Sequence, residues 1–236
     1  MAERLPELRP LKGRIRVLAF HGSDGLGRRP YRTFLADYYV TSDPVDLAAE
    51  GPGHAGHEHL TFSNCVANTG DGPLVLEMTR TSRNRAQVAQ LMEDDEKPRD
   101  RWRRKPAGTA VRDTNPDHNH WHYADFLQYR LKSVRTGRYV GEPMKQSFCL
   151  EDVAKLRADA GRRGFTRCPN PRANKGIMGI SVGWGDVYWA GLQEQFIEVK
   201  GLPPGTYWLE CVVDPRRRLE LKTRGRLSTR VKVRIR

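Results

Sequence analysis

The stretch that decides the fold covers residues 180–213 and reads ISVGWGDVY (180–188), WAGLQEQ (189–195), FIEV (196–199), KGLPPGT (200–206) and YWLECVV (207–213). Its apolar runs are rich in β-branched and aromatic residues, which favour strands. The segments between them contain glycine, proline and polar residues, which are typical of turns. We therefore predict strands over residues 180–188, 196–199 and 207–213.

Outside this stretch the chain continues in the same way. Residues 228–236 alternate apolar and basic side chains, as a half-buried edge strand does. Toward the N-terminus we predict an exposed, charged connection over 93–105 and strands over 14–20, 60–66, 74–79, 87–92 and 118–132. A short helix is predicted over 152–163, with Asp152 as its cap. Together these elements predict a mainly β protein with an antiparallel β-sandwich core, long loops and at most one or two short helices.

The chain has 236 residues, which is enough for one domain with a buried core. We expect residues 1–55 to form a strand and loop region packed on that core, and residues 56–236 to form the sandwich itself. The whole chain is then one domain.

The run His118-Asn119-His120-Trp121-His122 carries three of the seven histidines at alternate positions. Alternate side chains of a β-strand point to one face, so the three imidazoles would converge. Three neutral nitrogen ligands with open coordination positions suit copper or zinc, whereas calcium and magnesium prefer oxygen. We therefore predict a transition-metal site at His118, His120 and His122. The alternative is an exposed strand with polar alternation and no metal.

The histidine run resembles the copper-binding H-x-H-x-H segment of the lysyl oxidase family, and further segments follow in the family's order. Residues 145–152, KQSFCLED, resemble its K-x-S-F-C-L-E-D segment, and residues 183–188, GWGDVY, resemble its G-x-x-D-x-Y segment. Residues 195–199 and 204–207 are similar to its next strand and its P-G-x-Y turn. The resemblance extends from about Gly56 to Pro215 and implies a catalytic β-sandwich over residues 56–236.

This resemblance implies a copper amine oxidase whose cofactor, lysyl tyrosylquinone, forms from Lys145 and Tyr188. Such an enzyme oxidises primary amines, above all peptidyl-lysine side chains, to aldehydes. Dioxygen is reduced to hydrogen peroxide, and the amine nitrogen is released as ammonia. A nearby Cu²⁺ favours the ionised phenol of Tyr188, which is the better electron donor. Lys145 can add to the oxidised ring only as a neutral amine, which requires a partly buried or electropositive setting.

The reaction also needs a carboxylate that removes a proton from the substrate carbon, and two aspartates are candidates. Asp186 precedes Tyr188 by two residues, so the two share a face in an extended segment. Asp125 matches the aspartate that follows the family's histidine triplet and is slightly favoured, because it would lie beside the metal strand. Burial of either residue would raise its pKa toward neutrality. Both could equally be ordinary turn or capping residues.

Basic residues outnumber acidic ones by 41 to 28, which gives a net charge of +13 at pH 7. A field of this sign attracts anionic partners. The sequence contains none of the usual nucleic-acid-binding motifs, so we expect no nucleic-acid partner and, at most, attachment to an anionic surface. The expected partners are a primary-amine substrate, chiefly protein lysine, and dioxygen.

The four cysteines, Cys65, Cys149, Cys168 and Cys211, allow three pairings into two disulfides. We favour Cys149 with Cys168, which links neighbouring segments, and Cys65 with Cys211, which links two predicted core strands. Animal members of the family have more cysteines, including one where this chain has Asp117, so their pairing cannot be transferred. Four buried free thiols are the alternative.

Residues 1–8, MAERLPEL, lack the apolar core of a signal peptide, and no apolar run is long enough to span a membrane. The resemblance implies an extracellular protein, whereas an N-terminus without a signal-peptide core leaves the cytoplasm as the alternative location.

Two other functions stay open at this point. The first is a noncatalytic copper-binding β-sandwich that never forms the quinone. The second is a basic nucleic-acid-binding module, whose affinity would fall steeply with added salt.

Overall fold

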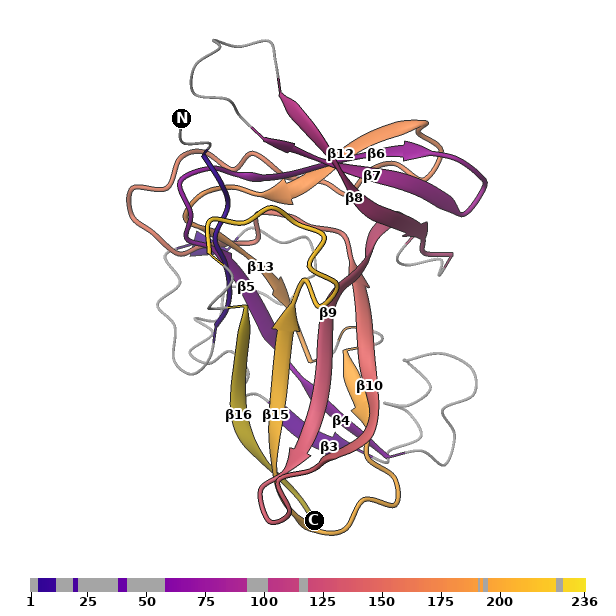
Figure 1. Cartoon of the computed structure of the whole chain (residues 1–236), viewed down its shortest axis with the longest axis vertical. Helices are drawn as coiled ribbons and strands as arrows, with labels where there is room; N and C mark the ends of the chain where they lie inside the picture. Colours follow the sequence, from indigo (N-terminus) through magenta and orange to yellow (C-terminus); the bar gives the residue numbers. More distant parts are fainter. Residues whose placement is uncertain are drawn as a thin grey trace.

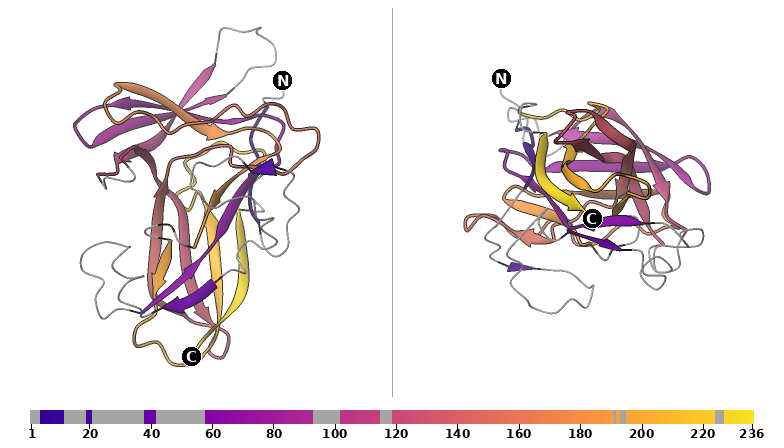
Figure 2. Two further views of the ribbon diagram at one scale, coloured as in Figure 1. Left: turned by 180° about the vertical axis from the view of Figure 1, so that it is seen from behind. Right: turned by 90° about the horizontal axis from the view of Figure 1, so that it is seen from below.

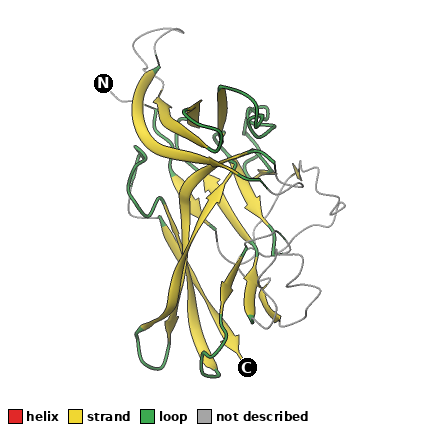
Figure 3. Ribbon diagram, turned by 90° about the vertical axis from the view of Figure 1, so that its right-hand side faces the viewer, coloured by secondary structure: helices red, strands yellow, loops and turns green. Residues whose placement is uncertain are grey.

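The computed structural model describes residues 4–11, 19–20, 38–41, 58–92, 102–114, 119–190, 192, 195–223 and 227–236. Within these residues every regular element is a β-strand and none is a helix (Figure 3). All the strand pairs among them are antiparallel. The prediction of a mainly β, antiparallel protein is therefore confirmed.

The largest sheet has eight strands. Seven of them follow the order β12 (Lys175–Ile180), β6 (Leu74–Arg80), β7 (Arg85–Met92), β8 (Arg103–Arg112), β9 (Trp121–Ser133), β15 (Gly205–Val213) and β16 (Ser228–Ile235). The eighth, β10 (Tyr139–Phe148), pairs with β9. Figure 1 shows β12, β6, β7 and β8 at one end of the molecule, whereas β9, β10, β15 and β16 run along its length. The long strand β9 joins the two halves, because it pairs with β8 near its start and with β15 further along.

Two smaller sheets complete the structure. The five-stranded sheet has the order β1 (Leu8–Pro10), β5 (Asn64–Asn68), β13 (Trp184–Tyr188), β11 (Ala154–Lys155) and β2 (Ala19–Phe20). The three-stranded sheet has the order β14 (Phe196–Glu198), β4 (His59–Phe62) and β3 (Tyr38–Thr41). Figure 2 shows β4 and β5 crossing one side of the part of the large sheet formed by β9, β15 and β16.

The core lies between these layers. Tyr129 of β9 is fully buried and meets the ring of Phe62 of β4 edge-on, with 4.6 Å between the ring centroids. Phe148 of β10 stacks on Tyr188 of β13, with 3.6 Å between the centroids. Burying an aromatic side chain of this size contributes about 1.5–3 kcal/mol. Contacts of this kind hold the facing sheets together as a sandwich.

Several predicted strands coincide with observed ones, and these are the predictions for 74–79 (β6), 87–92 (β7), 196–199 (β14), 207–213 (β15) and 228–236 (β16). Two other predictions are wrong in their bounds. The strand expected over 60–66 is divided at Ser63 into β4 and β5, which belong to different sheets. The strand expected over 180–188 is interrupted by a turn at Gly183, whose φ is 79°. The strand expected over 14–20 lies outside the described residues except for β2.

Strands β8 and β10 were not predicted. The exposed connection expected to extend to residue 105 is wrong at its end, because β8 begins at Arg103 and continues past Pro106 and Gly108. A bulge opposite Val88 accommodates the extra residue Ala107, which is fully buried. Gly108 has a φ of 109°, and a Cβ there would lie 2.7 Å from Nη1 of Arg218, so glycine fits this bulge best.

The helix predicted over residues 152–163 is wrong. Ala154–Lys155 form the short strand β11 instead, and Asp152 caps no helix. Its fully buried carboxylate accepts hydrogen bonds from the backbone N–H groups of Gly164 (2.8 Å), Phe165 (3.1 Å) and Ser181 (2.7 Å). A carboxylate that satisfies donors from two separate segments fixes a loop here, which local propensity cannot indicate.

The N-terminal strands pair directly with core strands: β1 with β5, β2 with β11, and β3 with β4. The division of the chain at residue 55 stays a prediction. Among the described residues no helix is long and apolar enough to cross a membrane.

Candidate metal and tyrosine site

Two of the three predicted metal ligands meet at the start of β9. His120 lies in a bend just before the strand, and His122 is the strand's second residue. Their Nε2 atoms are 2.8 Å apart and their ring centroids 4.7 Å apart. Trp121 between them points into the core and is fully buried. The strand was expected to begin at His118, which lies outside the described residues. That start is wrong, because β9 begins at Trp121. The convergence of His120 and His122 therefore depends on the bend as well as on strand alternation.

Asp113, which the sequence did not single out, lies behind the histidines. Its Oδ2 atom is 3.9 Å from Nδ1 of His122, and its N–H donates to the carbonyl of His120 at 2.9 Å. His122 therefore has one ring nitrogen toward His120 and the other toward a carboxylate. A carboxylate behind a metal-binding imidazole orients the ring and raises its basicity. Only the pairing of β8 with β9 brings Asp113 to this position.

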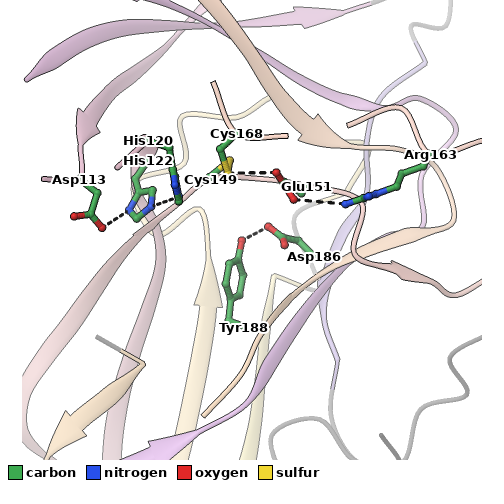
Figure 4. Close-up of a disulfide and its surroundings, with 9 residues drawn as sticks. All are labelled: Asp113, His120, His122, Cys149, Glu151, Arg163, Cys168, Asp186 and Tyr188. Atoms are coloured by element: carbon green, nitrogen blue, oxygen red, sulfur yellow. Dashed lines mark hydrogen bonds and ion pairs between the residues drawn. A yellow bond between two sulfur atoms is a disulfide. The ribbon is translucent and has the colours of Figure 1, made fainter. Parts of the chain in front are cut away.

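A disulfide between Cys149 and Cys168 adjoins the histidines, as Figure 4 shows. A nitrogen of His120 and the two sulfur atoms all lie within 4.8 Å of one another. The predicted pairing of Cys149 with Cys168 is confirmed. We call Asp113, His120, His122, Cys149 and Cys168 the histidine–disulfide cluster.

The predicted pairing of Cys65 with Cys211 is wrong, since both are free and buried. Neighbouring residues of a strand point to opposite faces. Asn64 of β5 directs its amide nitrogen toward Sγ of Cys211 at 3.6 Å, whereas Cys65 belongs to a separate apolar cluster with Ala154 and Val187. The two thiols therefore lie on different faces of β5. Burial raises the pKa of both thiols.

Tyr188 and Asp186 form a buried hydrogen-bonded pair on β13. The hydroxyl of Tyr188 donates to Oδ2 of Asp186, and the two side chains are 4% and 2% exposed. Burial, and secondarily the charge of Glu151, raises the pKa of Asp186 well above its ordinary value. Burial also raises the pKa of Tyr188, and the neighbouring Asp186 adds to this effect. In the folded protein the pair therefore retains its protons to a higher pH than either group would in water.

Glu151 lies between the disulfide and the tyrosine pair (Figure 4). Its Oε1 atom is 3.3 Å from Sγ of Cys168, and its Oε2 atom is 3.5 Å from Nη2 of Arg163. Its charge also acts on the carboxyl of Asp186. Glu151 thus contacts the disulfide directly and acts on the Tyr188–Asp186 pair through its charge.

Lys145 is not brought to Tyr188. It lies on β10 in register with Gln128 and is exposed, whereas the next residue, Gln146, is 2% exposed. Tyr188 is buried on the core side, where it stacks on Phe148. Strand alternation therefore directs Lys145 away from the side of β10 that faces Tyr188. Lys145 precedes Phe148 by three positions, a span of about 10 Å in an extended strand.

Asp125 lies within β9 in the left-handed conformation, with a φ of 57°, which aspartate tolerates better than most residues. Its Oδ2 atom accepts from Nε of Arg216 at 2.6 Å and lies 3.6 Å from Nη2 of Arg218. The carboxylate is thus already engaged by two guanidinium groups. Of the two candidate bases, only Asp186 is hydrogen-bonded to Tyr188.

Comparison with known proteins agrees with the motifs. The family model described as lysyl oxidase matches residues 59–224, which is more than two thirds of the chain. Lysyl oxidase homolog 3B of Danio rerio is 38% identical over 99 residues, covering 42% of this chain and 11% of that protein. Lysyl oxidase homolog 2 of Gallus gallus is 37% identical over 99 residues, covering 42% and 12%. Protein-lysine 6-oxidase of Homo sapiens is 35% identical over 99 residues, covering 42% and 22%.

The aligned part of the chain spans no more than 22% of the length of these relatives. The family model, by contrast, extends from the start of β4 to beyond β15 and includes both the histidine–disulfide cluster and the Tyr188–Asp186 pair. On this match the chain belongs to the lysyl oxidase family.

Proposed function

We propose that this protein catalyses the copper-dependent oxidative deamination of primary amines, chiefly peptidyl-lysine side chains, to aldehydes, with release of ammonia and hydrogen peroxide. The observation that carries the proposal is the arrangement of two imidazoles and a buried Tyr188–Asp186 pair around one disulfide. Family membership supports the copper amine oxidase class.

The donor set fits copper. His120 and His122 present nitrogen atoms 2.8 Å apart, Asp113 lies behind His122, and His118 is the third proposed ligand. Imidazole nitrogen suits copper and leaves positions open for small oxygen ligands. When bound, copper and the lysyl tyrosylquinone made from Lys145 and Tyr188 would supply the electron transfer between amine and dioxygen, which amino-acid side chains alone do not perform.

The role that we assign to Asp186 is to hold and move a proton. Its Oδ2 atom accepts the hydrogen bond of the Tyr188 hydroxyl, so it is positioned to take that proton when the phenol ionises. Its raised pKa makes it a stronger base than an ordinary aspartate once it is ionised. We propose the same carboxylate as the base that removes the substrate proton.

Asp125 is the second candidate for this base. Its ion pairs with Arg216 and Arg218 support a role in fixing the segment that follows β15 against β9. Replacing each aspartate with asparagine separates the two assignments. We expect Asp186→Asn to abolish amine turnover and Asp125→Asn to retain it, and the opposite result would transfer the role to Asp125.

Quinone formation requires Lys145 to reach Tyr188. We propose that β10 shifts its register locally, which would move Lys145 to the face of the strand that points toward Tyr188. Among the described strands β10 pairs with β9 alone, and its register is irregular on both sides of Lys145, between Val140 and Met144 and between Gln146 and Phe148. A shift of one residue in strand register exchanges the two faces. An edge strand with such irregularities can rearrange without breaking the rest of the sheet.

The outer face of the large sheet supports attachment to an anionic surface. Arg230 and Lys232 lie over the ring of Trp208, at 4.4 Å and 5.2 Å from its centroid, and Arg130 and Lys132 flank Tyr139 in the same way. These cation–π contacts hold cationic side chains in place on an exposed sheet face. We expect salt-sensitive binding to vesicles that contain anionic lipid and none to neutral vesicles.

The exposed position of Lys145 favours a second candidate, a copper-binding protein that never forms the quinone. Copper loading in air followed by peptide mapping distinguishes the two. The proposed oxidase should yield a peptide in which residues 145 and 188 are joined, visible quinone absorbance and reaction with phenylhydrazine. Bound copper with residues 145 and 188 unjoined would refute the oxidase and leave the copper-binding protein.

A further inference from the structure

Three metal-binding groups of the histidine–disulfide cluster lie close together, namely His120, Cys149 and Cys168, and of these the mechanism above uses only His120 as a metal ligand. A ring nitrogen of His120 and the sulfur atoms of Cys149 and Cys168 lie within 4.8 Å of one another. Nε2 of His122 is 2.8 Å from Nε2 of His120. Two sulfur donors and one nitrogen donor therefore lie close enough to share one ion, with His122 beside His120 as a further nitrogen donor. The disulfide bond is what withholds the two sulfurs from a metal.

We propose that reduction of the Cys149–Cys168 disulfide creates a zinc-type site formed by Cys149, Cys168, His120 and His122, so that the redox state of this disulfide selects which metal the histidines hold. The regulatory part rests on the proposed function, because it assumes that these histidines are the ones that bind copper. The metal site itself does not depend on that function.

The chemistry of the change balances with a dithiol as the reductant. The dithiol gives two electrons and two protons to the sulfur–sulfur bond, which breaks into two thiols while the dithiol closes into its own disulfide. Zn²⁺ then displaces one proton from each thiol and binds two thiolates and two neutral imidazoles. The charges of the two thiolates cancel that of the ion, which suits a site whose Cys149 is only 8% exposed.

The distances among three of the four donors require little movement. Zinc–sulfur bonds of about 2.3 Å and zinc–nitrogen bonds of about 2.0–2.1 Å place the donors of a tetrahedron roughly 3.4–3.8 Å apart. The separations among His120, Cys149 and Cys168 reach at most 4.8 Å, so shifts of about 1 Å would bring these three donors into place. His122, which lies beside His120, would have to move further to become the fourth ligand. Cys168 is partly exposed, which gives a small reductant access to the disulfide.

The two redox states would prefer different metals. With the disulfide closed, the histidines offer nitrogen alone, which suits Cu²⁺. With it open, two thiolates favour zinc and similar ions and divert His120 and His122 from copper. A reducing compartment would therefore keep the protein in its zinc-binding form, whereas an oxidising one would allow copper to be loaded.

Cobalt(II) tests this site, because it replaces zinc and gives near-ultraviolet charge-transfer bands only when thiolates bind it. Reduced protein in a phosphine reductant should show these bands at one equivalent of Co²⁺ and lose them when Zn²⁺ is added. Oxidised protein should show none. Identical spectra in the two redox states would overturn the proposal.

Matched variants identify the thiols. The double variant Cys149→Ser/Cys168→Ser should lose the bands, whereas Cys65→Ala/Cys211→Ala, which removes the two buried free thiols, should keep them. Bands that follow Cys65 and Cys211 instead would refute the assignment.

The His120→Ala variant tests the site even if the double serine variant does not fold. It retains both cysteines, so it can fold with the disulfide intact and be reduced afterwards. It should weaken zinc binding by more than about 100-fold, the upper end of what an outer-shell partner alone contributes. Unchanged zinc affinity in this variant would overturn the proposal. None of these readouts uses amine turnover, so a protein that binds cobalt as described but oxidises no amine would refute the proposed function and leave this site standing.

Discussion

Replacing Asp186 with asparagine should change how the stability of the protein depends on pH. In the wild-type protein the side chain is 2% exposed, and burial raises its pKa well above the ordinary value. The unfolded chain ionises this group at its ordinary pKa of about 3.9. Between that value and the raised folded pKa, the unfolded state binds fewer protons than the folded state, so the contribution of Asp186 to stability falls as the pH rises.

The magnitude follows from the same proton balance. One proton held only by the folded state lowers the free energy of unfolding by about 1.4 kcal/mol for each pH unit within this window. Asparagine does not ionise, has nearly the same shape, and can still accept the hydrogen bond of Tyr188. The stability of Asp186→Asn relative to the wild type should therefore increase with pH inside the window, by on the order of 1 kcal/mol for each pH unit.

Urea unfolding of both proteins at a series of pH values between 4 and 8 measures this difference. Val187→Ala on the same strand is the matched control: it removes buried apolar volume at a cost of about 1–3 kcal/mol but no ionisable group, so its curve should stay parallel to that of the wild type. If Asp186→Asn also ran parallel to the wild type, the carboxyl would ionise normally in the folded protein and its assignment as a raised-pKa base would fail.

Three further predictions concern the same region. His122→Ala should lose copper retention while keeping the fold, because His122 is only partly buried; metal analysis after dialysis checks this, and full occupancy would contradict the ligand assignment. Lys145→Arg should keep copper but form no joined peptide and oxidise no amine, since a guanidinium group is not a usable nucleophile; turnover in this variant would contradict the role of Lys145. Phe148→Ala removes the ring that stacks on Tyr188 and should destabilise the protein by about 3–5 kcal/mol in urea unfolding, and a cost below 1 kcal/mol would show that the stacking contributes little.

The strands that alternate clearly were predictable from local pattern. Residues 74–79, 207–213 and 228–236 carry apolar side chains on one face, and each of them lies in an observed strand. Strand β8 was not predicted, because Arg103, Pro106 and Gly108 are residues typical of a loop. Only pairing with β7 and β9 makes this segment a strand. Asp152 led to the wrong prediction of a helix, because an aspartate that caps a helix and an aspartate that fixes a loop look alike in sequence.

The sequence by itself determined the chemical inventory of the site: the histidine run, the cysteines, the Tyr188–Asp186 spacing and the family to which they belong. Spacing within one strand is local, which is why the position of Asp186 beside Tyr188 could be expected. Only the tertiary structure decided that Cys149 pairs with Cys168 while Cys65 and Cys211 stay apart on opposite faces of β5, and that Asp113 and Glu151 join the site. It also decided the outward direction of Lys145, because the face that a side chain occupies depends on strand register, and register is set by contacts between segments far apart in the chain.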